Sequence, residues 1–346
     1  MRTFECDYTE GAHPKILEAL IRTNMEQMSG YGSDPYTERA AKKIKAAIGA
    51  PVSSVTFLVG GTQTNMIAID LLLAPYEGVL SPKTGHINVH EAGAIEFTGH
   101  KVIALPEHDG VLDVDALEAY LCDFYADATH EHMVRPGLVY LTHPTEYGTL
   151  YTKAQLSRIR ALCDRYEMKL YVDGARLGYA LGCPENELTL ADLAALCDAF
   201  SIGGTKLGLL CGEAVVFGRE TPKALLSQVK RHGGLLAKGR VLGVQYDAMF
   251  TDGLYEAIGR EAIRHARRIR GILEAKGYPF AWNSPTNQQF VLLNDAEVDA
   301  LKRHVGFDLW GRTADGRWIV RFTSSWSTTD ADVDELERAL PDKQEL

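Results

Sequence analysis

Short apolar segments alternate with longer segments of helical period along most of the chain. Residues 36–48 (YTERAAKKIKAAI) repeat apolar side chains every three or four positions and predict a helix, with Asp34 as its cap and Pro35 in its first turn. Residues 55–59 (VTFLV) predict a strand that leads through a glycine turn into a helix over 62–73. Further strands are predicted at 87–89, 102–105, 138–142, 170–172, 199–202 and 214–217, and further helices at 114–125 and 153–166.

This order of elements predicts an α/β core. Strands that are separated by helices of this length form a mainly parallel sheet with helices on both faces. Antiparallel strands are expected only where the connection between two strands is short.

The pattern changes after Gly218. A long helical region over 221–276 is broken at Gly233 and Gly234 and again near Asp252. Two strands (289–293 and 318–322) and two helices (295–304 and 329–340) then predict a smaller α+β unit. We therefore predict a large domain over residues 1–250, which includes the N-terminal segment, and a small C-terminal domain over 251–346.

The composition narrows the class of protein. Hydrophobic residues make up 46% of the 346 residues, enough for a substantial core. Acidic residues outnumber lysine and arginine by 46 to 36, and the formal net charge of −10 argues against a nucleic-acid partner. No apolar run approaches the ~20 residues that span a bilayer, and the first residues do not resemble a signal peptide. We expect a cytoplasmic protein with no membrane partner.

The six cysteines are scattered without a CxxC pair. Cys122, Cys163 and Cys197 fall at apolar positions of predicted helices. This spacing favours reduced, buried thiols over disulfides or zinc, and we predict no metal site.

A glycine-rich turn at Gly60, Gly61 and Thr62 joins a predicted strand to a predicted helix. The N-terminus of a helix offers unpaired N–H groups and the positive end of the helix dipole, and glycines let a ligand approach the backbone closely. The turn therefore suits a phosphate group. The alternative is that the turn needs glycine only for its geometry, because the dinucleotide pattern GxGxxG is absent.

An apolar strand at 169–172 ends in Asp173, and Arg176 follows three residues later. Ligands of parallel α/β sheets bind at the carboxyl ends of the strands, where this acid falls. A carboxylate at that place can pair with a cationic ring nitrogen. The alternative is that Asp173 caps the next helix and Arg176 forms a surface ion pair.

Lys206 follows the predicted strand 199–202 among small and apolar neighbours, with no acid adjacent in sequence. A desolvated lysine has a lowered pKa and can attack an aldehyde, whereas a solvated loop lysine cannot do so readily. Three strand ends then supply an anion site, an acid and an amine. These are the groups that pyridoxal phosphate requires of a protein, including a Schiff-base lysine.

From about residue 7 to residue 335, the chain resembles the low-specificity L-threonine aldolases of the β-eliminating-lyase branch of fold type I pyridoxal-phosphate enzymes. The resemblance is carried by five motifs: YGSDP at 31–35, GGTQTN at 60–65, HINVHEAG at 86–93, VDGAR at 172–176 and TK at 205–206. It implies an aspartate-aminotransferase-like large α/β domain with a mainly parallel seven-stranded sheet and a small C-terminal α+β domain.

The resemblance assigns roles residue by residue. Lys206 is expected to bind the cofactor aldehyde and Asp173 its ring nitrogen, and His86, or alternatively His90, is expected to stack on the ring. Arg176 is expected at the cofactor's phenolic oxygen or the substrate carboxylate, and Arg321 at the substrate carboxylate. The phosphate is assigned to Gly60, Gly61, Thr62 and Thr205. The alternative for Arg321 is an exposed strand arginine.

Several positions depart from the family pattern. Cys6 stands where the family has serine, beside Asp7, and Glu146 stands where the family has a histidine near the substrate hydroxyl. Lys238 lies next to the position of a family arginine and is a possible substitute for it at the cofactor. The resemblance also places Tyr31, Asp7 and His143 at the substrate. As the catalytic base, His86, His143 and Glu146 remain alternatives.

The implied reaction is cleavage of the Cα–Cβ bond of a β-hydroxy-L-amino acid of the threonine, allo-threonine or phenylserine type to glycine and an aldehyde. The alternatives are another fold type I enzyme, either a β-eliminating lyase or an aminotransferase, and a non-catalytic protein that binds a phosphate ligand. The resemblance further implies a homo-oligomer, a dimer of dimers, with sites at the subunit interface.

Overall fold

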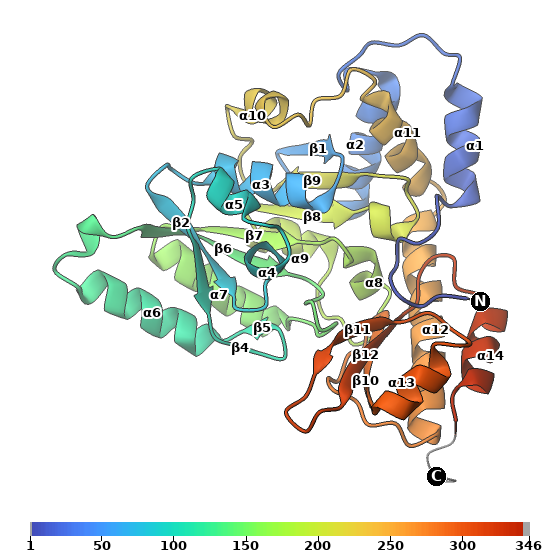
Figure 1. The fold of residues 1–346 in the computed structure, drawn as a ribbon. Helices are drawn as coiled ribbons and strands as arrows, with labels where there is room; N and C mark the ends of the chain where they lie inside the picture. The colour runs from blue at the N-terminus through green and yellow to red at the C-terminus, as the bar shows by residue number, and fades with distance from the viewer. Residues whose placement is uncertain (1, 342–346) are drawn as a thin grey trace.

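The computed structural model describes residues 2–341 and has a seven-stranded sheet at its centre (Figure 1). Its strands are β1 (Ser54–Leu58), β2 (Glu77–Pro82), β3 (Val102–Leu105), β6 (Arg135–Thr142), β7 (Lys169–Asp173), β8 (Ala199–Gly203) and β9 (Glu213–Phe217), in the order β1-β9-β8-β7-β6-β2-β3. Strand β9 is antiparallel to both of its neighbours, and the other neighbouring pairs are parallel. The predicted mainly parallel seven-stranded sheet is therefore confirmed.

Helices cover both faces of this sheet. Successive residues of β6 point to opposite faces: Leu138 and Tyr140 belong to a core that includes α3, whereas Val139 and Leu141 belong to a core that includes α2 and α7. The near-continuous burial of the central strands follows from this double cover. The helices are α1 (Pro14–Thr23), α2 (Pro35–Ile48), α3 (Gly61–Leu72), α4 (His86–Val89), α5 (Ala94–Phe97), α6 (Val114–Ala126), α7 (Lys153–Arg165), α8 (Leu177–Leu181), α9 (Leu190–Leu196), α10 (Leu225–Arg231) and α11 (Arg240–Met249).

A smaller α+β unit follows, as predicted. Its antiparallel sheet has the order β10-β12-β11, and its apolar core is separate from those of the large sheet. The elements are α12 (Leu254–Ala275), β10 (Gln288–Leu293), α13 (Asp295–Leu301), β11 (Asp308–Arg312), β12 (Trp318–Thr323) and α14 (Asp330–Ala339). The N-terminal segment also reaches this unit, because Phe4 joins its core and Thr3 pairs with Gly306 (Figure 1). The division at residue 250 stays a prediction.

Some predicted elements differ from the structure. Residues 87–89 were expected as a strand because Ile87 and Val89 are β-branched, but they lie in the short helix α4. The sheet strand in this region is β2, which was not predicted because its sequence EGVLSP contains a glycine and a proline, two residues that are unfavourable in strands. The long helical region after Gly218 consists of three helices, α10, α11 and α12. Helix α1, strand β11, a short hairpin of β4 (Glu107–His108) and β5 (Val111–Leu112), and a 3-10 turn at His130–His132 were not predicted, although α1 is amphipathic.

The predicted burial of three cysteines holds for two of them. Cys163 and Cys197 are buried, but Cys122 is exposed on α6, so the prediction for Cys122 was wrong.

The side chain of Asp34 accepts hydrogen bonds from two N–H groups in the first turn of α2, at 3.1 and 2.9 Å, which confirms it as the cap.

None of the helices within residues 2–341 combines the length and apolar character needed to cross a membrane. In the same range, no group of three or more His, Cys, Asp and Glu side chains is arranged to hold a metal ion.

Candidate active site

Three chain segments meet at the edge of the large sheet where its parallel strands end. Asp173 ends β7, Lys206 follows β8 in the 3-10 turn Thr205–Leu207, and residues 59–60 join β1 to the first turn of α3. Strands β1 and β8 flank β9 and are both antiparallel to it, so they run in the same direction and end at the same edge. Asn65 of α3 links two of the segments, because its Nδ2 donates to Asp173 Oδ2 at 2.8 Å.

Asp173 is a buried carboxylate surrounded by hydrogen-bond donors. It is 4% exposed. Its Oδ2 also accepts from the Tyr140 hydroxyl at 2.8 Å, and its Oδ1 accepts from Ala175 N at 2.9 Å and from the Ser201 hydroxyl at 3.4 Å. Helix α8 has no side-chain cap, so the alternative role of Asp173 as a cap does not apply. These four donors satisfy both carboxylate oxygens at the end of β7.

A hydrogen-bond network extends from Asp173 to His86. Asn65 Nδ2 also donates to Glu91 Oε1 at 2.7 Å, and Glu91 Oε1 contacts His86 Nδ1 at 2.8 Å. The Tyr171 hydroxyl donates to Asn65 Oδ1 at 2.9 Å, which fixes the orientation of the amide. The local sequence pattern indicates no role for Asn65 or Glu91, although both lie inside the family motifs.

The environment of Lys206 lowers its pKa. Burial is the main cause, and the nearby positive charge of Arg176 adds to it, while Asp7, Asp173 and Glu213 act in the opposite direction. Lys206 itself is partly buried, and its role as the reactive amine stays a prediction. A lysine with a lowered pKa is more often neutral near pH 7 and is then nucleophilic.

Arg176 and Asp7 form a buried ion pair rather than a surface pair. The guanidinium donates from Nε and Nη2 to the two oxygens of Asp7, at 2.7 and 2.9 Å, and the Asp7 side chain is fully buried. Asn287 of the C-terminal unit donates to Asp7 Oδ2 at 3.0 Å. Burial by itself would raise the pKa of Asp7, but the charge and hydrogen bonds of Arg176 lower it overall.

Arg321 is buried in the C-terminal unit, and the alternative of an exposed strand arginine is wrong. It is 7% exposed, donates to Gln288 Oε1 and Asp308 Oδ2, both at 2.8 Å, and lies 4.7 Å from the centre of the Trp310 ring. Its Nε is buried and, among the described residues, has no hydrogen-bond partner. Burial lowers the pKa of Arg321, and the nearby charge of Arg176 adds to this effect.

His86 and Glu146 lie against each other. The backbone N–H of His86 donates to Glu146 Oε1 at 2.8 Å, and the Thr142 hydroxyl donates to the same oxygen at 2.7 Å. Glu146 is buried, and this burial raises its pKa. The ring of His86 is 35% exposed and is 5.5 Å from the ring of His90.

His143 is not available to a substrate. Its Nε2 contacts Asn186 Oδ1 at 2.9 Å, and its Nδ1 accepts from the backbone N–H of Tyr151 at 3.4 Å. The side chain is buried, and burial lowers its pKa to about 4. Because both ring nitrogens already have partners within the chain, we correct its assignment as a base or substrate contact.

The glycine turn is open. A side-chain carbon added at Gly60 or Gly61 would meet no atom within 4 Å, and no side chain caps the N-terminus of α3. Packing within the chain therefore does not explain these glycines. The Thr205 hydroxyl accepts from Gly212 N at 3.1 Å, which holds the turn that carries Lys206.

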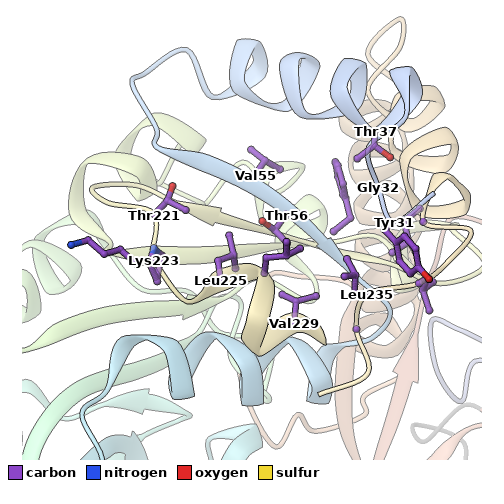
Figure 2. Close-up of a pocket in the computed structure, with 17 residues that line it drawn as sticks. Tyr31, Gly32, Thr37, Val55, Thr56, Thr221, Lys223, Leu225, Val229 and Leu235 are labelled. Atoms are coloured by element: carbon purple, nitrogen blue, oxygen red, sulfur yellow. The ribbon is translucent and has the colours of Figure 1, made fainter. Parts of the chain in front are cut away.

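Tyr31 and Lys238 lie elsewhere. Tyr31 lines an apolar cavity of about 490 Å³ between β1 and α10, and neither Lys206 nor Asp173 lines this cavity (Figure 2). Half of the Tyr31 side chain is exposed, and its backbone N–H donates to Ala237 O at 3.1 Å, next to the exposed Lys238. Within one chain, the structure brings these two residues near each other but not into the cluster around Lys206.

The family model and the similar proteins found by comparison agree with one another. A family model described as beta-eliminating lyase matches residues 4–305. The low specificity L-threonine aldolase of a Pseudomonas species is 29% identical over 341 residues, which cover 96% of this chain and 95% of that protein. A threonine aldolase structure from Leishmania major has 40% identity and a TM-score of 0.93, with 98% of each chain covered. A putative L-allo-threonine aldolase from Listeria monocytogenes, at 18% identity and a TM-score of 0.75 over 100% of this chain and 97% of that chain, shares the fold.

Proposed function

Because this chain belongs to the beta-eliminating lyase family, we propose that it is a pyridoxal-phosphate-dependent aldolase that cleaves β-hydroxy-L-amino acids to glycine and an aldehyde. The observation that carries the proposal is the position of Lys206, with its lowered pKa, at the same sheet edge as the buried Asp173. The likeness to threonine aldolases over nearly the whole chain supports this reaction.

The residues at this edge fit pyridoxal phosphate. The open N-terminus of α3 at Gly60 and Gly61 suits the phosphate, because helix N–H groups bind anions and no side chain fills the space. Asp173 would hold a proton on the ring nitrogen, and Lys206 would bind the aldehyde. Bound there, the cofactor supplies an electron sink for the carbanion that remains when the Cα–Cβ bond breaks.

Two arginines would orient the substrate. Arg321 has a buried Nε–H without a partner among the described residues, and such a donor is costly unless a ligand accepts from it. We assign this N–H to the substrate carboxylate. Arg176, held by Asp7, presents its positive charge to the same region. Holding the carboxylate fixes which bond of Cα is weakened.

His86 is the base that the contacts favour. Its Nδ1 is engaged by Glu91, so its Nε2 can accept the proton of the substrate's β-hydroxyl group. Glu146 lies behind His86 with one carboxylate oxygen occupied by Thr142 and by the His86 backbone. We therefore assign Glu146 to the support of His86.

A product assay tests this function. Purified protein with added pyridoxal phosphate should release aldehyde and glycine in equal amounts from L-threonine, L-allo-threonine or L-phenylserine. Release of ammonia and a keto acid would instead indicate a β-eliminating lyase. If added pyridoxal phosphate shows no change in absorbance, a non-catalytic phosphate-binding role is favoured.

We further propose that Tyr31 and Lys238 serve the site of a neighbouring subunit in a homo-oligomer, built as a dimer of dimers. Tyr31 is held beside Ala237 and Lys238, and it lines a cavity that Lys206 of its own chain does not line, although the family resemblance places both residues at substrate and cofactor. A second copy of the chain would bring them to a site.

Subunit mixing tests this arrangement. Tyr31→Ala and Lys206→Ala should each be inactive alone, but the two chains refolded together should regain roughly a quarter of wild-type activity, because one site of each mixed dimer is intact. The control is Asp173→Asn mixed with Lys206→Ala. Both of these residues lie in one chain's site, so no mixed site is intact and activity stays absent. If the Tyr31 mixture also stays inactive, Tyr31 acts within its own chain. If Tyr31→Ala alone is fully active, Tyr31 has no role in the site.

A further inference from the structure

Trp310 lies beside both of the side chains that the proposed function gives to the substrate. The guanidinium carbon of Arg321 is 4.7 Å from the centre of the Trp310 ring. The centre of the His90 ring is 6.2 Å from that of Trp310 and 5.5 Å from that of His86. A substrate whose carboxylate reaches Arg321 and whose β-hydroxyl group reaches His86 would therefore lie next to this indole.

Trp310 is the extra residue of a β-bulge. Its two neighbours on β11 lie opposite consecutive residues of β12, so Trp310 itself has no counterpart on that strand. A bulge interrupts the regular alternation of side chains and changes their direction, and bulges are frequent next to active sites. Asp308, two positions earlier on β11, accepts a hydrogen bond from Arg321 at 2.8 Å. Strand β11 therefore presents both a carboxylate and an indole to the same arginine.

Trp310 belongs to an aromatic cluster that joins the C-terminal unit to the large sheet. Its ring lies edge-on to Phe290 of β10, with 5.4 Å between ring centres, and edge-on to Tyr147, with 6.4 Å. Tyr147 stacks on Trp282, with 3.8 Å between ring centres. Because Tyr147 directly follows Glu146, the cluster reaches the segment behind the proposed base.

This aromatic cluster is separate from the apolar cores of the fold. None of its side chains belongs to the three buried apolar cores within residues 2–341, and Tyr147, Trp282 and Trp310 stay partly exposed. Packing of the cores therefore does not account for these rings. Aromatic rings attract one another in edge-on or offset arrangements, with about 4.5 to 7 Å between their centres. The cluster thus offers a partner to an aromatic group of a ligand.

We propose that Trp310 determines the specificity for the substrate's side chain and selects an aromatic β-hydroxy-L-amino acid over one with a small aliphatic side chain. The inference rests on the proposed function for the reaction and names the side chain that the site prefers. An aryl group on the Cβ of a substrate held by Arg321 and His86 packs against the indole. A methyl group at the same place covers much less of it and leaves more apolar surface in water.

Binding of two amino acids that lack a β-hydroxyl group tests the proposal, because this cleavage cannot occur with either. Isothermal titration calorimetry of the full-length protein loaded with pyridoxal phosphate should give a lower Kd for L-phenylalanine than for L-alanine. Trp310→Ala should reduce the ratio of the two constants roughly tenfold, because the aromatic contact and its buried area are lost. A shift of Arg321 does not change this ratio, because both ligands have the same carboxylate. Trp310→Phe keeps a ring and should retain most of the preference.

Trp318→Ala is the matched control. Trp318 lies in the same sheet and also has an arginine over its ring, Arg312 at 4.0 Å, but it packs against the core of the C-terminal unit. Its replacement should leave the ratio unchanged in folded protein. The proposal is rejected by an unchanged ratio in Trp310→Ala, or by a wild-type protein that binds L-alanine as tightly as L-phenylalanine. If Trp310→Ala does not fold, Trp310→Leu, which has no ring, takes its place.

Binding and product release can fail separately. A protein that binds L-phenylalanine through Trp310 but releases no aldehyde from L-phenylserine or L-threonine would overturn the proposed reaction and support the role of Trp310. Release of aldehyde together with a ratio that Trp310→Ala leaves unchanged would support the reaction and overturn the role of Trp310.

Discussion

Lys206→Ala should abolish aldehyde release, with a loss of kcat of about 10³-fold or more, because the variant lacks the amine that binds and returns the cofactor aldehyde. The folded structure offers no nearby lysine as a replacement within the described residues of the cluster, whose cations are Lys206, Arg176 and Arg321. Arginine keeps its charge near pH 7 and cannot act as the nucleophile.

The absorbance of the cofactor distinguishes loss of the amine from loss of folding. Wild-type protein mixed with pyridoxal phosphate should give a new visible absorbance band that Lys206→Ala lacks, while the far-UV circular dichroism of the two proteins stays the same. Lys101→Ala, at an exposed lysine, is the matched control and should behave as wild type. A Lys206→Ala protein that keeps both the band and its turnover would remove Lys206 from the site.

The positions of Lys206 and Asp173 could be predicted from the sequence because both follow apolar strands directly. The carboxyl ends of parallel strands share one edge, so a residue that ends one strand is placed near a residue that ends another. Local patterns and the parallel arrangement of the sheet are therefore sufficient to place the proposed amine and acid at one edge.

Contacts between distant side chains could not be predicted in this way. The two ring nitrogens of buried His143 contact Asn186 Oδ1 and the backbone N–H of Tyr151. Nothing in the local sequence pattern around His143 indicates these partners. In the same way, Tyr140 and Tyr171 follow the apolar alternation of buried strands and resemble core aromatics. Their hydroxyls bond to Asp173 and Asn65.

The burial of charged side chains could not be predicted from the sequence. Asp7 and Arg321 are both charged and could have been surface residues by their sequence context, yet both are almost fully buried. Glu213 begins an apolar strand and is also buried, which its position at a strand end does not predict. Whether a charged side chain lies inside depends on which elements fold over it, and Asp7 is covered by Asn287, a residue 280 positions later.

Asp173→Asn should reduce kcat by about two to three orders of magnitude while the visible absorbance of bound cofactor persists. The amide has no negative charge with which to keep the ring nitrogen protonated, so the electron sink is weakened in the bond-breaking step. The substitution also replaces one carboxylate oxygen, which accepts hydrogen bonds, by an NH₂ group, which donates them, although the neighbouring groups are themselves donors. The amide of Asn65 and the hydroxyl of Tyr140 both donate to Asp173 Oδ2, so an NH₂ group at that position would leave donors facing donors.

The pairing of these two readouts separates the roles of Asp173 and Lys206. Loss of kcat with the absorbance band retained indicates the acid, and loss of both indicates the amine. Asp198→Asn is the matched control: Asp198 is also buried, but it lies at the opposite edge of the sheet, where it pairs with Arg160 at 2.7 Å and accepts from Leu170 N. Its replacement should lower the free energy of unfolding, because it leaves Arg160 partly unpaired, and should leave kcat per folded molecule unchanged. An Asp173→Asn protein with wild-type kcat would show that the ring nitrogen does not depend on this carboxylate, and the assignment of Asp173 would fail.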